Sequence, residues 1–134
     1  MVKLVGGIPV CVPCLEDAQL DLEAIRKAIT PKTAAIIINS PNNPTGAVYT
    51  SESLRAIAEL AVQNNIYVIA DEIYEKLVYG ESSHYSIAAV SPEIYERTIV
   101  INGMSKAYRM TGWRIGYSAA PRDIARGINA LQGH

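Results

Sequence analysis

The sequence has too few cysteines and histidines for the metal and disulfide frameworks that many small domains use. It contains two cysteines and two histidines, and one cysteine pair without a second does not supply the ligands of a structural zinc site. Cys11 and Cys14 flank Pro13 at the end of an apolar run, whereas a redox-active C-x-x-C pair normally opens a helix that lowers the thiol pKa. We therefore expect two ordinary packing cysteines and no metal site.

The sequence also lacks an excess of one charge and a long apolar run. Twelve Lys and Arg residues oppose thirteen Asp and Glu residues, for a net charge of -1, so neither nucleic acid nor an acidic membrane is an expected partner. No apolar run has the length of a membrane span, and the start "MVKLVGGIPV" lacks a signal-peptide layout. We expect a soluble, cytoplasmic protein whose 134 residues form one domain.

Apolar runs do alternate with amphipathic patterns along the chain. The predicted helices cover residues 21–29, with Asp21 as N-cap, 51–65 and about 121–131. The runs predicted as strands are residues 6–14, 34–39, 66–70, 98–102 and 113–119. Alternation of this kind is typical of an α/β fold, here a mainly parallel sheet with flanking helices, and the continuous run 34–39 is typical of a strand covered on both faces.

One connection predicts an exception to the parallel arrangement. Only ten residues join the runs 98–102 and 113–119, and a parallel crossover needs about a dozen or more. The last strand is therefore expected to run antiparallel to its neighbour. Its beginning, which carries Arg114, then lies at the edge where the parallel strands end.

Polar clusters follow three of the predicted strands. "SPNNPTG" follows the run 34–39, "DEIY" follows 66–70 and "GMSK" follows 98–102. In open α/β sheets, ligands bind outside the carboxyl ends of the strands, so these clusters are expected to converge on one edge.

Each cluster has an ordinary structural interpretation as well. "SPNNPTG" suits a strand-to-helix turn, and Asp71 suits a helix N-cap. Lys106 is compatible with a surface lysine and Arg114 with a structural ion pair. Together these side chains indicate a binding site for one particular ligand. They could bind an aldehyde, a ring nitrogen, a phenolic oxygen and a phosphate at this edge. Pyridoxal phosphate has all four groups, forms a Schiff base with lysine, and commonly has an Asp beside its pyridinium nitrogen.

Three segments carry a resemblance to a known family. "NSPNNPTG", "ADEIYEKLVYG" and "NGMSKAYRMTGWRIGY" resemble, in order, the central motifs of the class I/II aminotransferases, which are fold-type I pyridoxal-phosphate enzymes of the aspartate aminotransferase kind. The resemblance covers essentially the whole chain. It implies an enzyme that moves an amino group between an amino acid and a 2-oxo acid, in a homodimeric parent protein.

The resemblance also implies roles for individual residues. Lys106 is similar to the lysine that forms the Schiff base and moves the substrate proton, and its neutral amine is expected to need burial and a neighbouring cation. Asp71 corresponds to the partner of the ring nitrogen. The implied contacts of the phenolic oxygen are Asn43 and Tyr74, and Arg114 is the implied phosphate ligand.

Two positions depart from the family pattern. Many members have a serine for the phosphate where this chain has Gly103, which leaves Ser105 as a substitute. Arg109 occupies a position where family members usually have a small residue, and the resemblance gives Arg109 no role.

The resemblance implies that residues 1–134 are the middle of a large cofactor-binding domain, without the small domain, and inactive alone. The strands 34–39, 66–70, 98–102 and 113–119 are then expected side by side in that order. The run 7–12 is expected one place beyond the run 34–39, with an intervening strand that another part of the parent chain supplies. We therefore expect the run 7–12 to be unpaired with this core or shifted into the place of that strand. Exposed apolar edges are expected to cause self-association.

Two other interpretations remain open from the sequence. One is another fold-type I enzyme, such as a carbon–sulfur lyase or a decarboxylase, which shares this core. The other is a binding or structural α/β domain whose lysine is inert.

Overall fold

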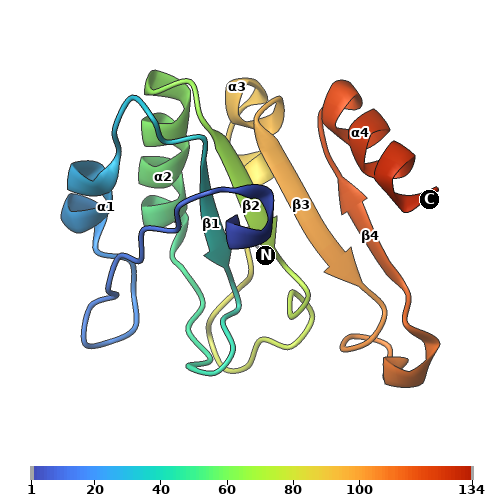
Figure 1. Ribbon diagram of the computed structural model, residues 1–134. Coiled ribbons are helices and arrows are strands. Elements are labelled where there is room, and N and C mark those ends of the chain that lie inside the picture. The colour runs from blue at the N-terminus through green and yellow to red at the C-terminus, as the bar shows by residue number, and fades with distance from the viewer. Residues whose placement is uncertain (1, 134) are drawn as a thin grey trace.

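A four-stranded sheet forms the centre of the computed structural model, which describes residues 2–133 (Figure 1). Its strands lie in the order β1-β2-β3-β4, with β1, β2 and β3 parallel and β4 antiparallel to β3. Their bounds are Ala35–Asn39, Tyr67–Asp71, Thr98–Gly103 and Gly116–Ala119. The predicted fold class, strand order and single antiparallel strand are confirmed.

The helices begin at the capping residues that the sequence provides. Asp21 accepts a hydrogen bond from the backbone N–H of Ala24 (2.9 Å), and Thr50 accepts one from Ser53 (3.1 Å). These bonds satisfy N–H groups that have no partner inside the helix. The helices are α1 (Leu22–Ala28), α2 (Ser51–Gln63), α3 (Pro92–Tyr95) and α4 (Arg122–Gln132), and the 3-10 turns are η1 (Val2–Val5), η2 (Ile87–Ala89) and η3 (Thr111–Trp113).

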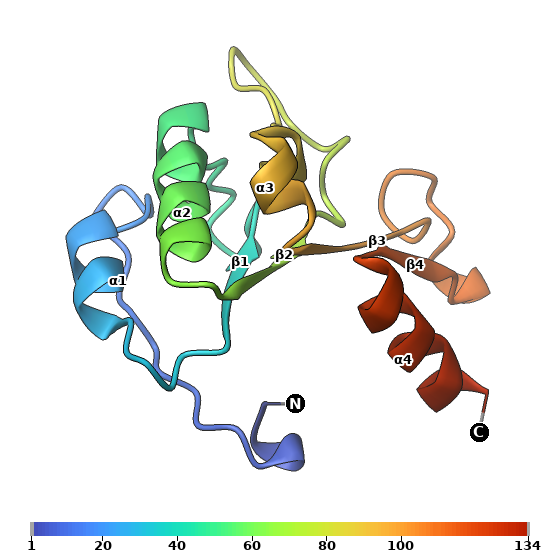
Figure 2. The same cartoon turned by 90° about the horizontal axis from the view of Figure 1, so that it is seen from above.

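The helices cover the two faces of the sheet unequally. Figure 2 shows α1, α2 and α3 on one face, with α4 on the other, beside β4. The core lies under the first group, where α2 packs its apolar stripe against the sheet. Its largest fully buried side chains are Leu54, Ile57, Val68, Ile87 and Ile94.

The other face of the sheet leaves apolar side chains in solvent. Ile37 of β1 is 58% exposed and Ile101 of β3 is 42% exposed. The prediction that the run 34–39 is covered on both faces is therefore wrong for this chain. Among the described residues, α4 is the helix on that face, and it lies beside β4 rather than across β1 (Figure 2).

The N-terminal segment also differs from its prediction. Residues 6–14 form no strand, because an extended run without a neighbouring strand has no partner for its ladder of hydrogen bonds. The segment is accordingly unpaired with the core sheet, one of the two outcomes expected for the run 7–12. Cys11 and Cys14 are free and exposed, so the prediction that they pack in the interior is wrong here.

The last strand also differs in length from its prediction. The predicted strand 113–119 is shorter than expected, because Trp113 belongs to η3 and Arg114 has a left-handed backbone, with φ of 54°. In the described part of the chain, no helix has both the length and the apolar character needed to cross a membrane.

Candidate active site

The three predicted polar clusters leave the sheet at one edge. The parallel strands end there and β4 begins there (Figure 1). The register sets Asn39 beside Asp71 and Asp71 beside Ile101, while Gly103 faces Gly116. The convergence predicted from the strand ends is confirmed.

Asn39, the last residue of β1, links two of these loops. Its Nδ2 donates to the backbone carbonyl of Asp71 (3.1 Å). Its Oδ1 accepts from the Nδ2 of Asn42 (3.2 Å) and from the backbone N–H of Asn43 (3.2 Å). One amide therefore fixes the loop after β1 to the end of β2. Sequence reasoning gave Asn39 no role, although a polar residue ending an apolar run is a signal that points to such a link.

Asn43, Tyr74 and Lys106 meet beside this link. The Nδ2 of Asn43 donates to the phenol oxygen of Tyr74 (3.1 Å). The Nζ of Lys106 lies 5.5 Å from the centre of the Tyr74 ring, within the range of a cation–π contact. Three loops that are distant in sequence thus bring together an amide, a phenol and an amine.

Asp71 lies at the end of β2, and its carboxylate closes a turn. Its Oδ1 accepts from the backbone N–H of Ile73 (3.2 Å). Within residues 2–133 no helix begins at this point, so the helix N-cap interpretation of Asp71 does not hold. The side chain is half-buried, and one of its oxygens has no hydrogen-bond partner among those described for the turn.

Lys106 is more exposed than the sequence suggested. It follows the end of β3 in a turn, and Lys106 itself is exposed, so the predicted burial is wrong for this chain. The physical reason is the thin cover at this end of the sheet, where all four residues of β4 are exposed.

Arg114 and Ser105 are not joined to the other predicted residues. The Nη1 of Arg114 donates to the backbone carbonyl of Thr111, three residues earlier (3.2 Å). Ser105 is half-buried beside Lys106. Arg109 is exposed and has a left-handed backbone, with φ of 56°, and no contact described for it suggests a role.

Comparison with known proteins places this arrangement in a family. The family described as Aminotransferase class I and II matches the chain over residues 1–134. The chain belongs to this family.

Individual aminotransferases are similar to nearly all of the chain. An aspartate aminotransferase of Geobacillus stearothermophilus is 50% identical over 135 residues, which are 99% of this chain and 34% of that protein. The solved aspartate aminotransferase of Thermus thermophilus with maleate is 47% identical, with a TM-score of 0.91 over 97% of this chain and 34% of that one. N-Succinyldiaminopimelate aminotransferase from Mycobacterium tuberculosis is 44% identical, with a TM-score of 0.92 over 96% of this chain and 34% of that one.

The fold is therefore that of the fold-type I aminotransferases, and the chain spans about a third of the length of these relatives, 34% of each. The sequence departure at Gly103 has a steric reason within this fold. A Cβ on Gly103 would lie 2.8 Å from the backbone oxygen of Ile115 and 3.2 Å from the Cδ1 of Ile73. The close approach of β3 and β4 therefore leaves little room for a side chain at position 103.

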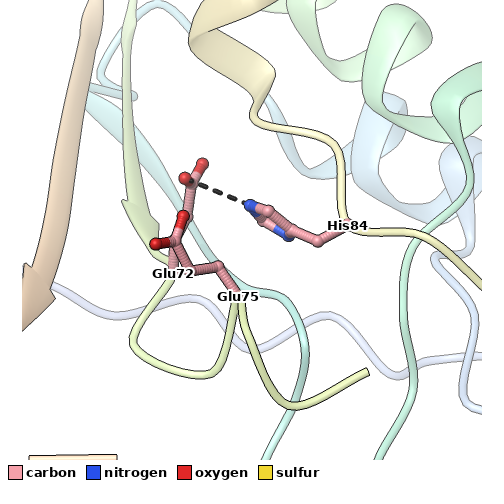
Figure 3. A group of neighbouring side chains, drawn as sticks. All are labelled: Glu72, Glu75 and His84. Atoms are coloured by element: carbon pink, nitrogen blue, oxygen red, sulfur yellow. Dashed lines mark hydrogen bonds and ion pairs between the residues drawn. The ribbon is translucent and has the colours of Figure 1, made fainter. Parts of the chain in front are cut away.

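A second cluster lies on the helix-covered side of β2. The side chains of Glu72, Glu75 and His84 place ligand atoms within 4.8 Å of one another (Figure 3). The dashed line in Figure 3 joins the Nε2 of His84 to the Oε2 of Glu72, at 3.3 Å. The Nδ1 of His84 is buried without a hydrogen-bond partner. A metal ion bound through Nε2 would make Nδ1–H a buried donor without an acceptor, so the cluster fits a hydrogen-bonded group better than a metal centre.

Proposed function

We propose that this chain is the central part of the cofactor-binding domain of a pyridoxal-phosphate-dependent aminotransferase. The observation that carries the proposal is the meeting of Asn43, Tyr74 and Lys106 beside Asp71, at the carboxyl edge of the sheet. The family membership supports it.

The donor set at this edge fits the cofactor's chemistry. The hydrogen-bonded pair Asn43 and Tyr74 offers an amide N–H and a phenol to an oxygen anion. The carboxylate of Asp71 has one oxygen held by Ile73, which leaves the other to face a protonated ring nitrogen. Lys106 supplies the amine that an aldehyde requires. Ser105 and Arg114 are proposed phosphate ligands, since Arg114 donates through one nitrogen to Thr111 and has further N–H groups to offer.

These residues would divide the reaction between them. The bound cofactor supplies an electron sink for the pair left when a proton leaves the substrate Cα. The carboxylate of Asp71 keeps a proton on the ring nitrogen by its negative charge. The phenol of Tyr74, held by Asn43, orients the ring through its oxygen. The amine of Lys106 would take the proton from the substrate Cα and deliver it to the cofactor carbon that carried the aldehyde.

The attachment residue is the sharpest test of this proposal. The complete protein that contains this chain is loaded with pyridoxal phosphate, reduced with borohydride, digested and mapped. The label is expected on Lys106, and the variant Lys106→Ala is expected to lose both the label and turnover while keeping its fold. A label on Lys3, Lys27, Lys32 or Lys76 would contradict the proposal.

The reaction class follows from the products of the same preparation. An aminotransferase yields a 2-oxo acid from the amino donor and a new amino acid from the acceptor. Release of a sulfur compound or of carbon dioxide would instead favour the lyase or decarboxylase interpretation. The relatives carry names such as aspartate aminotransferase and aspartate/prephenate aminotransferase, so aspartate and 2-oxo acids are the first pair to assay. We further propose a cytoplasmic homodimer for the complete protein.

A further inference from the structure

Glu72 is a buried carboxylate next to Asp71 in the chain. Its exposed fraction is 5%. Side chains alternate along a strand, so Glu72 points to the face that carries the buried Val68 and Ala70, opposite to Asp71. Its backbone N–H continues the ladder by donating to the carbonyl of Ile101 (2.9 Å). A buried carboxylate in this position is costly unless hydrogen bonds compensate its lost hydration.

The segment that follows β2 supplies those bonds. The Oγ of Ser86 donates to Oε1 of Glu72 (2.8 Å), and the Nε2 of His84 lies 3.3 Å from Oε2. The side chain of His84 is 12% exposed, and its Nδ1 is buried without a partner. The contact with Oε2 needs a proton on Nε2, whereas a proton on Nδ1 would be an unpaired buried donor.

The same glutamate begins the turn that carries Tyr74. The backbone carbonyl of Glu72 accepts from the N–H of Glu75 (2.9 Å), and the N–H of Ile73 donates to Asp71 (3.2 Å). Glu72 therefore fixes residues 71–75 in two ways. Its backbone bonds to β3, and its side chain bonds to residues 84–86. Tyr74 lies in the middle of this turn, between Asn43 and Lys106.

We propose that Glu72 and His84 are positioning residues, whose buried hydrogen bond sets the orientation of Asp71 and Tyr74 toward the cofactor. The part of this inference that concerns the cofactor rests on the proposed function. Neither side chain touches the reacting groups; both act through the turn 71–75.

Amide hydrogen exchange tests the turn without any cofactor. We compare the 134-residue protein with His84→Leu, which removes the donor, and His84→Gln, whose amide places a donor near the position of Nε2. Loss of one bond to a buried carboxylate is expected to speed exchange at Ile73 and Glu75 about tenfold relative to Val68. His84→Gln is expected to restore most of the protection, and Glu81→Gln, an exposed change in the same segment, is expected to alter nothing.

Cofactor affinity in the complete protein is the second measurement. His84→Leu is expected to raise the Kd for pyridoxal phosphate about tenfold, and His84→Gln to bring it back to within about threefold of the unmodified protein. If His84→Leu does not fold, Ser86→Ala removes the other bond to Glu72 and takes its place.

The outcomes separate the two proposals. Unchanged exchange at Ile73 and Glu75 in His84→Leu overturns the positioning inference, whatever the cofactor does. Faster exchange with an unchanged Kd also overturns it, because Glu72 and His84 then serve stability alone. A complete protein that binds no pyridoxal phosphate rejects the proposed function and the cofactor part of this inference, while the exchange data still decide whether His84 holds the turn.

Discussion

At the scale of single residues, the sequence predicted which side chains meet at the edge of the sheet better than it predicted how buried they are. Asn43 and Tyr74 were predicted from strand-end motifs, and they form a direct hydrogen bond. Lys106 was expected to be buried and is exposed, because burial depends on whatever covers the edge of the sheet. Asn39 and Glu72 were not assigned roles. Their hydrogen bonds are made with partners such as Asp71 and His84, which lie 32 and 12 residues away in the chain, so no local pattern predicts them.

Asp71 gives a prediction that separates chemistry from folding. Asp71→Asn keeps an oxygen for the N–H of Ile73, so the free energy of unfolding is expected to change by less than about 1 kcal/mol. The ring nitrogen loses its negative partner, and turnover by the complete enzyme is expected to fall by several orders of magnitude, roughly 5 kcal/mol or more of barrier.

The measurement compares the melting temperature and turnover of Asp71→Asn in one preparation. Asp123→Asn, an exposed aspartate in the first turn of α4, is the matched control and is expected to leave turnover unchanged. Full turnover in Asp71→Asn would remove Asp71 from the proposed chemistry.

At the scale of elements, the hydrophobic pattern and the connection lengths predicted the order and direction of the strands. They did not predict the structure of residues 6–14 or the start of β4. The ten residues between the last two predicted strands indicated a reversal, and β4 is antiparallel. The run 6–14 has the composition of a strand without a partner to pair with, and it forms none. The predicted strand 113–119 begins late because the left-handed backbone of Arg114 interrupts it. Strand propensity therefore identified extended runs, while pairing decided which of them became strands.

The contact between β3 and β4 predicts a strong effect of a small substitution. Gly103→Ala would place a methyl group 2.8 Å from the backbone oxygen of Ile115. Backbone has to move to relieve this overlap, which typically costs about 1–3 kcal/mol of stability. The control is Gly112→Ala, where nothing lies within 4 Å of the added Cβ, and its free energy of unfolding is expected to be nearly unchanged. Chemical denaturation of both variants measures the difference. Equal stabilities would show that β3 and β4 separate without cost.

At the scale of the whole molecule, the exposed face of the sheet dominates the behaviour of this chain. Ile37 and Ile101 leave apolar surface in water, and the chain spans 34% of the length of its relatives. Such surface tends to be covered by other protein. No motif in the sequence predicted which face would lack cover, because that depends on the placement of α4 rather than on the composition of the strands.

Self-association is the expected result for the purified chain. Analytical ultracentrifugation at increasing concentration is expected to show species larger than a monomer. Ile37→Lys, which puts a charge on the exposed face, is expected to shift the distribution toward monomer. Gln63→Lys, an exposed change at the end of α2, adds the same charge elsewhere and is expected to have little effect. A monomer at all concentrations would contradict the prediction.

Catalytic inactivity of the isolated chain is a separate expectation. The resemblance to the aminotransferases implies that a substrate-carboxylate clamp and a ring-stacking segment belong to other parts of the enzyme. Transamination by the 134-residue protein is therefore expected not to exceed that of pyridoxal phosphate mixed with free lysine. Robust turnover of any amino acid would show that residues 1–134 contain a complete site.

The amide of Asn39 has a consequence for how this edge tolerates variation. Because the side chain of Asn39 bonds the side chain of Asn42 as well as the backbone of Asp71 and Asn43, a library randomised at 39 and 42 should not accept changes one at a time. Substitutions at 39 are expected to survive selection mainly in combination with changes at 42, whereas an exposed position outside this unit, such as Glu81, is expected to vary freely. The two loops would then be inherited as a single block, and grafting either one alone into another protein of this fold would transfer half of a hydrogen-bonding unit.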